Sequence, residues 1–313
     1  MAEFTNIDKL ADKDLRKKKY NIKGEIQSKV HNDIYFKYNS VNLVIGKRGS
    51  GKTFMVMREM LKLAYLMHGF RSRYPTYNNY PQYTQIIYIT DKLRDDTCER
   101  AIHYINKLES VQFEWTSTDE ALNIINGLSA LKAFLANPEE YKKEMSKEDY
   151  TAAIVKFKEI LNCQELTTIP HTVIIFDDCI GLFNKYSPLS KKLFENRQSR
   201  ITYFLILQDV QGLNPSMKAN VDSLVLFGGF PKHKWNSLTY QMPLIDPDYT
   251  FANYYSKLSS HDFVFFDYVA NKIYEKLRHS DYIERPGRPE EDEEEEEYEE
   301  EEMDLSKLFP QTY

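Results

Sequence analysis

The octapeptide GKRGSGKT at residues 46–53 constrains this chain more than any other feature. It fits the pattern G-x-x-x-x-G-K-[ST] in full, and the short apolar run 41–45 (VNLVI) precedes it. Apolar residues at helical spacing follow over 53–68, with Gly69 as the expected end of that helix. Strand, glycine turn and helix in this order predict a loop whose backbone amides face inward at the amino end of a helix. This arrangement binds phosphate.

The residue types of the loop predict how a nucleotide would be held. Lys52 can reach the β- and γ-phosphates of ATP, and the Thr53 hydroxyl can ligate Mg²⁺. A glycine turn that binds no ligand is the alternative. The residues expected to bind the nucleotide are Gly46, Lys47, Arg48, Gly49, Ser50, Gly51, Lys52 and Thr53.

Alternating apolar runs and helical patterns predict the fold class. Strands are expected over 41–45, 86–90, 111–115, 172–176, 201–207 and 224–227. Helices are expected over 53–68, 93–108 and 118–163, the last with a break at Asn137-Pro138, and a hairpin is expected to pair 263–269 with 273–277. The sequence therefore predicts an α/β protein with a mostly parallel sheet covered by helices on both faces.

An acidic pair follows one of the apolar strands. Asp177 and Asp178 come directly after TVIIF, which is the pattern of a Walker B strand. We expect Asp177 to hold Mg²⁺ and Asp178 to orient or deprotonate the attacking water. Adjacent residues of an extended chain point to different sides, so the two roles do not compete. An exposed Asp-Asp turn is the alternative.

Polar residues flank the next apolar strand. Gln208 ends the run 201–207, and if that strand lies between those ending at Gly46 and Asp177, its amide faces the γ-phosphate. A strand-ending Gln bonded to the loop backbone would look the same. Arg197 and Arg200 precede the strand, and either is a candidate arginine finger for a neighbouring subunit or a simple surface arginine. Arg48 is a third candidate, acting within its own site.

Charge is distributed unevenly along the 313 residues, whose formal net charge is −6. Residues 290–304 hold 13 acidic groups, whereas the first 289 residues hold 40 basic and 34 acidic groups, a net of +6. We expect three parts: a polar and basic lead-in (1–35), one domain (36–285) with a helical insertion at about 118–163, and a disordered acidic tail (286–313).

Other features of the composition exclude some classes of protein. No run of about 18 apolar residues occurs, and the first 20 residues are charged, so we expect a soluble intracellular protein without a membrane partner. The chain has no C-x-x-C pair, which argues against a disulfide framework or a zinc site. Its cysteines are Cys98, Cys163 and Cys179.

Taken together, GKRGSGKT, TVIIFDDC and the stretch from Asn196 to Gly229 resemble the DNA-packaging ATPases of large cytoplasmic DNA viruses, virophages and polinton-like elements. These proteins belong to the FtsK/HerA superfamily, and the resemblance covers about residues 38–230. It implies a P-loop NTPase fold of the ASCE/RecA-like type. It further implies a homo-oligomeric, hexameric ring that uses ATP and Mg²⁺ to drive double-stranded DNA into a capsid, with a capsid vertex or portal protein as partner. The implied location is the cytoplasm of the host cell, in the viral factory, or the capsid itself.

Three features depart from that pattern. Many members of that superfamily carry Glu where this chain has Asp178, whose shorter side chain changes its reach. The helical region 118–163 and the acidic tail are not matched by the pattern.

Two other functions are compatible with the sequence. One is a nucleotide-dependent switch or scaffold that binds protein partners. The other is a P-loop kinase, which would want an Arg-rich lid and an acceptor pocket.

Overall fold

The computed structural model describes residues 36–37, 39–73, 83–92, 96–108, 111–161, 171–184, 187–242, 251–252, 255–269 and 271–277. The expected lead-in, residues 1–35, and the expected acidic tail, residues 286–313, lie outside the described residues, as does Cys163. The other two cysteines, Cys98 and Cys179, are buried free thiols.

Within these ranges the strands form one eight-stranded sheet in the order β3-β2-β4-β5-β1-β6-β7-β8. The first six strands in chain order pair in parallel, and β7 and β8 close one side as an antiparallel hairpin. The expected α/β fold with a mostly parallel sheet is confirmed. The strands are β1 (Val41–Ile45), β2 (Tyr83–Ile89), β3 (Gln112–Thr116), β4 (His171–Asp177), β5 (Ile201–Leu207), β6 (Ser223–Phe227), β7 (Phe263–Asp267) and β8 (Lys272–Leu277).

The position of β5 decides which residues meet. It lies between β1 and β4, with Ile45 opposite Leu207 and Asp177 opposite Ile206. Because the three strands run in parallel, the residues that follow them gather at one edge of the sheet. We call this the carboxyl edge, and the opposite one the amino edge.

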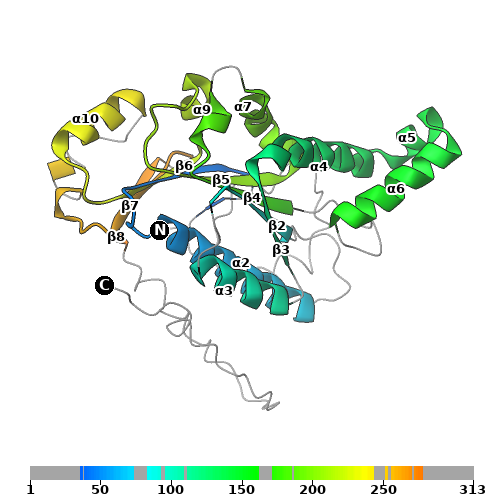
Figure 1. Cartoon of the computed structure of the whole chain (residues 1–313), viewed down its shortest axis with the longest axis horizontal. Helices are drawn as coiled ribbons and strands as arrows, with labels where there is room; N and C mark the ends of the chain where they lie inside the picture. The colour runs from blue at the N-terminus through cyan, green and yellow to red at the C-terminus, as the bar shows by residue number, and fades with distance from the viewer. Residues whose placement is uncertain are drawn as a thin grey trace, which may run out of the picture.

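Helices cover both faces of the sheet (Figure 1). On one face α2 and α3 pack against side chains such as Val44 and Ile206, and on the other α4, α7, α9 and α10 pack against Leu43 and Leu205. This alternation follows from the two-residue period of a strand. The helices are α2 (Lys52–Arg73), α3 (Asp96–Lys107), α4 (Ala121–Ala136), α5 (Pro138–Glu144), α6 (Lys147–Leu161), α7 (Pro188–Lys192), α8 (Asn196–Ser199), α9 (Pro215–Ala219) and α10 (Lys232–Gln241).

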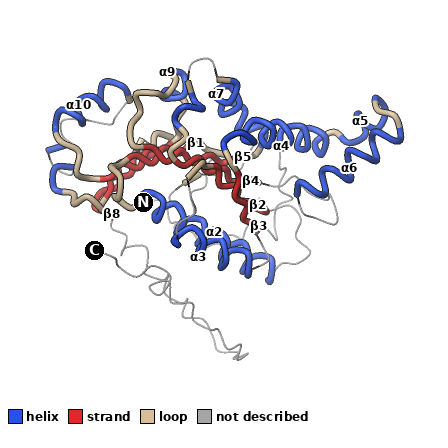
Figure 2. Tube along the Cα trace, in the orientation of Figure 1, coloured by secondary structure: helices blue, strands red, loops and turns tan. Residues whose placement is uncertain are grey.

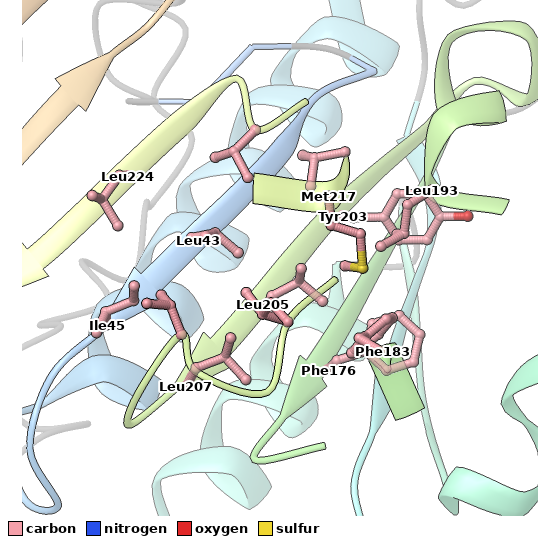
Figure 3. Close-up of a cluster of buried hydrophobic side chains, with 14 of the residues drawn as sticks. Leu43, Ile45, Phe176, Phe183, Leu193, Tyr203, Leu205, Leu207, Met217 and Leu224 are labelled. Atoms are coloured by element: carbon pink, nitrogen blue, oxygen red, sulfur yellow. The ribbon is translucent and has the colours of Figure 1, made fainter. Parts of the chain in front are cut away.

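The hydrophobic core between the sheet and helices α4, α7, α9 and α10 includes side chains of β1, β4 and β5, the strands that end at the carboxyl edge beside the polar residues. Figure 3 shows Leu43 and Ile45 of β1, Leu205 and Leu207 of β5 and Phe176 of β4 meeting side by side. All five are at most 1% exposed. A close-packed layer of this kind holds neighbouring strands in a single register, and so fixes the relative positions of the residues at their ends.

The described part of the region between β3 and β4 is mostly helical over residues 118–161, with one break at the expected place and a second between Glu144 and Lys147. Helix α4 ends at Ala136, and Pro138 begins α5, where its missing amide is tolerated at the first helical position. The ring of Phe134 lies 5.1 Å from that of Phe157, which packs α6 against α4. Helices α5 and α6 extend beyond the edge of the sheet (Figure 2).

The expected end of the first helix is wrong. Helix α2 does not end at Gly69 but continues to Arg73. A glycine inside a helix costs only about 1 kcal/mol relative to alanine, and a helix of 22 residues can absorb that cost through the side chains it buries on the sheet.

Close packing after β6 generates a stability prediction. A Cβ atom on Gly228 would lie 2.2 Å from the carbonyl oxygen of Ser259 and 2.8 Å from the Cβ of Leu258, and a backbone carbonyl cannot turn aside as a side chain can. We expect Gly228→Ala to lower the free energy of unfolding by about 2–3 kcal/mol, measured by urea denaturation. Gly181→Ala is the matched control, because nothing lies within 4 Å of its added Cβ. Equal midpoints for the two variants would contradict the prediction.

Candidate functional site

The loop between β1 and α2 has the backbone that its glycines predict. Gly49 and Gly51 have φ angles of 76° and 90°, in the left-handed region that glycine adopts without strain. A Cβ on Gly46 would lie 2.5 Å from Oγ of Ser50 and 2.7 Å from Cβ of Phe227. The residue at this position must therefore lack a side chain for the loop to pack against β6. Each loop glycine is therefore required by either conformation or space.

Lys52 lies at the first turn of α2 and its ammonium group points back into the loop. Nζ donates to the carbonyl oxygens of Gly46 (2.8 Å) and Lys47 (2.7 Å). Burial lowers the pKa of Lys52, and the nearby Asp177 carboxylate opposes that shift. The buried Oγ of Ser50 has no hydrogen-bond partner among the described residues. A buried ammonium group, a buried hydroxyl without a partner and the amino end of a helix fit a phosphate group, so the loop suits the nucleotide that its sequence predicts.

Asp177, the last residue of β4, lies directly beside Thr53. Oγ1 of Thr53 donates to Oδ2 of Asp177 over 3.0 Å, and the carboxylate is buried, with 4% of the residue exposed. The hydroxyl of Tyr88 also donates to Oδ2. Two oxygen ligands held this close, in front of a phosphate-binding loop, are the donor set that Mg²⁺ prefers. The residues present therefore fit the expected metal.

Asp178 turns out of the strand at the same edge. Its φ angle is 61°, and its amide donates to the carbonyl oxygen of Ile206 over 2.9 Å. Asp and Asn adopt this left-handed conformation far more readily than most residues, which gives a physical reason for Asp here in place of Glu. Nε2 of Gln208 donates to Oδ1 (3.3 Å) and Oδ2 (3.1 Å) of Asp178. Gln208 thus follows a strand that lies between β1 and β4, which was the condition for its expected role.

Residues after β2 also reach this edge, and the sequence analysis did not select them. Oγ1 of Thr90 donates to the carbonyl oxygen of Asp177 (3.0 Å), and Nζ of Lys92 lies 3.1 Å from Oδ1 of Asp177 and 3.3 Å from Oδ2 of Asp178. Burial opposes the charge of Lys92, but the two carboxylates outweigh it and raise the pKa of the ammonium group. The strand signal at 86–90 could have found these residues, because a second polar strand end was visible there.

The three arginines lie in two different places. Arg48 is an exposed residue of the loop itself. Arg197, in α8, and Arg200 precede β5 and therefore lie at the amino edge, away from Lys52 of the same chain. Arg197 pairs with Asp222 (Nη2 to Oδ1, 3.3 Å) and its side chain is 56% exposed. This placement excludes Arg197 and Arg200 from the site of their own chain and is compatible with a role in a neighbouring subunit.

Arg200 is held more firmly than Arg197. Its φ angle of 51° ends α8 in the left-handed conformation, and its carbonyl oxygen accepts hydrogen bonds from the amide of Thr172 (3.2 Å) and Nζ of Lys132 (3.1 Å). Burial lowers the pKa of the Arg200 guanidinium group. Lys132 comes from α4, so the helical region between β3 and β4 helps to fix the backbone at this edge.

Two other features are absent from the described part of the chain. Its residues include no group of three or more His, Cys, Asp and Glu side chains that could hold a metal ion. Among the same residues no helix is both long enough and apolar enough to cross a membrane.

Comparisons with known proteins find similarity only at the level of structure. No family model and no curated sequence matches the chain. The DNA-packaging ATPase from Sulfolobus turreted icosahedral virus aligns with a TM-score of 0.46 and 14% identity, over 77% of this chain and 98% of that one. EssC (ATPases 2 and 3) from Geobacillus thermodenitrificans aligns with a TM-score of 0.45 and 12% identity, over 77% and 39%. Similarity of this size assigns no residue role to the present chain.

The contact between Tyr88 and Asp177 generates a prediction. Tyr88→Phe removes one donor from a buried carboxylate while leaving the ring in place. Hydrogen bonds to charged groups contribute about 1.5–3 kcal/mol, so we expect the free energy of unfolding to fall by about that amount in urea denaturation. Tyr240→Phe is the control, because Tyr240 is 94% exposed, and it should unfold like the wild type. A Tyr88→Phe variant as stable as the control would show that the hydroxyl contributes nothing there.

Proposed function

We propose that this chain is a Mg²⁺-dependent ATPase that works as a ring-shaped motor and translocates double-stranded DNA into a viral capsid, in the cytoplasm of the host cell. The observation that carries the hydrolytic part is the gathering of Lys52, Thr53, Asp177, Asp178 and Gln208 at one sheet edge, with 3.0 Å between the Thr53 and Asp177 oxygens. Support for the DNA-translocating part comes from the resemblance of GKRGSGKT, TVIIFDDC and residues 196–229 to packaging ATPases.

Each residue at the carboxyl edge has a distinct role in this proposal. The loop amides and Lys52 bind the β- and γ-phosphates, and a Mg²⁺ ion held by Thr53 and Asp177 would supply positive charge to the phosphate oxygens. Asp178 accepts a hydrogen bond from the attacking water and orients it. Gln208 donates to Asp178 and so holds its carboxylate in place. Water activation of this kind favours a hydrolase over a kinase.

The amino edge contributes the remaining part of the proposed site. In a ring, the amino edge of one subunit would face the carboxyl edge of the next, so that Arg200 or Arg197 reaches the γ-phosphate held by the neighbour. Arg200 is the better candidate, because Lys132 and Thr172 fix its backbone. The hexamer and the capsid or portal partner are proposed from the sequence resemblance.

Steady-state ATPase activity with and without linear duplex DNA tests this function. We expect hydrolysis by the wild type that duplex DNA stimulates, and a loss of at least about 100-fold in Lys52→Ala and Asp178→Asn, because one removes phosphate binding and the other the carboxylate that orients water. The assay is run at low and at physiological salt, since phosphate contacts weaken with salt. Hydrolysis that ignores DNA at both salt concentrations would contradict the motor and favour a protein-regulated switch.

Mixing two inactive variants tests the contribution of the amino edge. Arg200→Ala would lack the finger and Asp178→Asn the water-orienting group, so each alone should be inactive. Mixed subunits place an intact Arg200 beside an intact Asp178 at a quarter of the interfaces in an equal random mixture, and we expect activity to return to about that fraction of wild type. Arg197→Ala is the matched control and should keep most activity alone. A mixture as inactive as its components would contradict a finger supplied by the neighbour.

A further inference from the structure

We infer that Lys92 is a positioning residue for hydrolysis, which holds the Asp178 carboxylate from the side opposite to Gln208. The inference rests on the proposed ATPase function and adds a residue to it from a strand that the sequence motifs do not include. Lys92 follows β2, which is the neighbour of β4 on the side away from β5.

The contacts place the Asp178 carboxylate between two donors. Nζ of Lys92 lies 3.3 Å from Oδ2 of Asp178, and Nε2 of Gln208 lies 3.1 Å from the same oxygen. The Asp178 side chain is 35% exposed, so packing alone does not fix its rotamer. A donor from each neighbouring strand restricts the carboxylate to the space between them, which is the geometry that a water-orienting group requires.

The backbone that carries Lys92 is itself held against β4. The amide of Lys92 donates to Oγ1 of Thr90 (3.2 Å), and that hydroxyl donates to the carbonyl oxygen of Asp177 (3.0 Å). Thr90 is buried, and its amide donates to the carbonyl oxygen of Thr116 over 3.1 Å. These hydrogen bonds hold the backbone of Lys92, after β2, beside the end of β4.

Charge gives Lys92 a second effect on the same pair. Asp177 and Asp178 are adjacent carboxylates, and Nζ of Lys92 contacts both, at 3.1 Å and 3.3 Å. A cation between two carboxylates offsets their repulsion and lets both stay close to the strand end. Phosphate binding belongs to other groups, the loop amides and Lys52, so loss of Lys92 should affect the chemical step far more than nucleotide affinity.

Steady-state kinetics of Lys92→Met and Lys92→Arg test the inference. We expect Lys92→Met to lower kcat by about 10–100-fold, the usual effect of removing a group that orients another, with KM and the Kd of a fluorescent ATP analogue changed less than about threefold. Lys92→Arg keeps a cation at the same place and should recover most of the activity. Lys107→Met, at an exposed lysine of α3, is the matched control and should behave as wild type.

A double-mutant cycle identifies the partner through which Lys92 acts. In single-turnover assays, Lys92→Met should cause no further loss in an Asp178→Asn background, because the carboxylate it holds is already gone. The inference would be overturned if Lys92→Met lowered the rate of the Asp178→Asn variant as much as it lowers the rate of the wild type, or if its main effect were a changed Mg²⁺ requirement. Either result would show that Lys92 acts through Asp177 instead. Wild-type kcat in Lys92→Met would overturn it outright.

The same experiments separate this inference from the proposed function. Wild-type hydrolysis that duplex DNA does not stimulate contradicts the DNA motor, while the kinetics of Lys92→Met still decide the role of Lys92. Wild-type protein that binds the ATP analogue and never hydrolyses ATP contradicts both. DNA-stimulated hydrolysis that is unchanged in Lys92→Met contradicts the role of Lys92 alone.

Discussion

The hydrogen bond between Thr53 and Asp177 joins two residues that are 124 positions apart, and the candidate site depends on it. It forms because β5 lies between β1 and β4 in parallel register, so that Ile45 and Asp177 end within one residue of the same level. Had either strand shifted by one residue, its side chains would have exchanged faces. The tightly packed layer around Leu43, Leu205 and Phe176 therefore holds the loop and the acidic pair at their mutual distance.

Much of this arrangement could be predicted from the sequence, because its signals are local. The run VNLVI, the glycine loop and the helix after it lie next to one another in the chain, and among their boundaries only the end of the helix differs by more than one residue from the expectation. Strands that end in polar residues also indicated which edge would carry chemistry, since parallel strands share that edge. The role expected for Gln208 requires β5 to lie between β1 and β4, and the sheet order meets this condition.

The residues that the sequence did not reveal depend on pairing between distant strands. Tyr88 looks like one more buried residue of an apolar strand until its neighbour in the sheet is known to be β4. Lys92 lies 85 positions before Asp177. The strand expected at 86–90 indicates the edge at which Lys92 lies, but its contact with Asp177 follows only from the pairing of β2 with β4. The conformation of Asp178 was equally hidden, because a φ angle of 61° follows from how the chain leaves the sheet. That conformation gives a physical reason for Asp178, where many of the proteins that the motif resembles carry Glu.

The course of β5 across the sheet has a mechanical consequence. One seven-residue strand, about 23 Å long, begins directly after Arg200 and ends directly before Gln208, and every one of its residues is buried. A buried strand inside a sheet cannot shorten or bend independently of its neighbours, so β5 behaves as a rigid element. In the proposed ring, where the amino edge of one subunit faces the carboxyl edge of the next, β5 would connect the nucleotide site of its own subunit with that of the neighbour. A displacement of Gln208 would then be transmitted along β5 to Arg200, and so to the adjoining subunit, without movement of a helix.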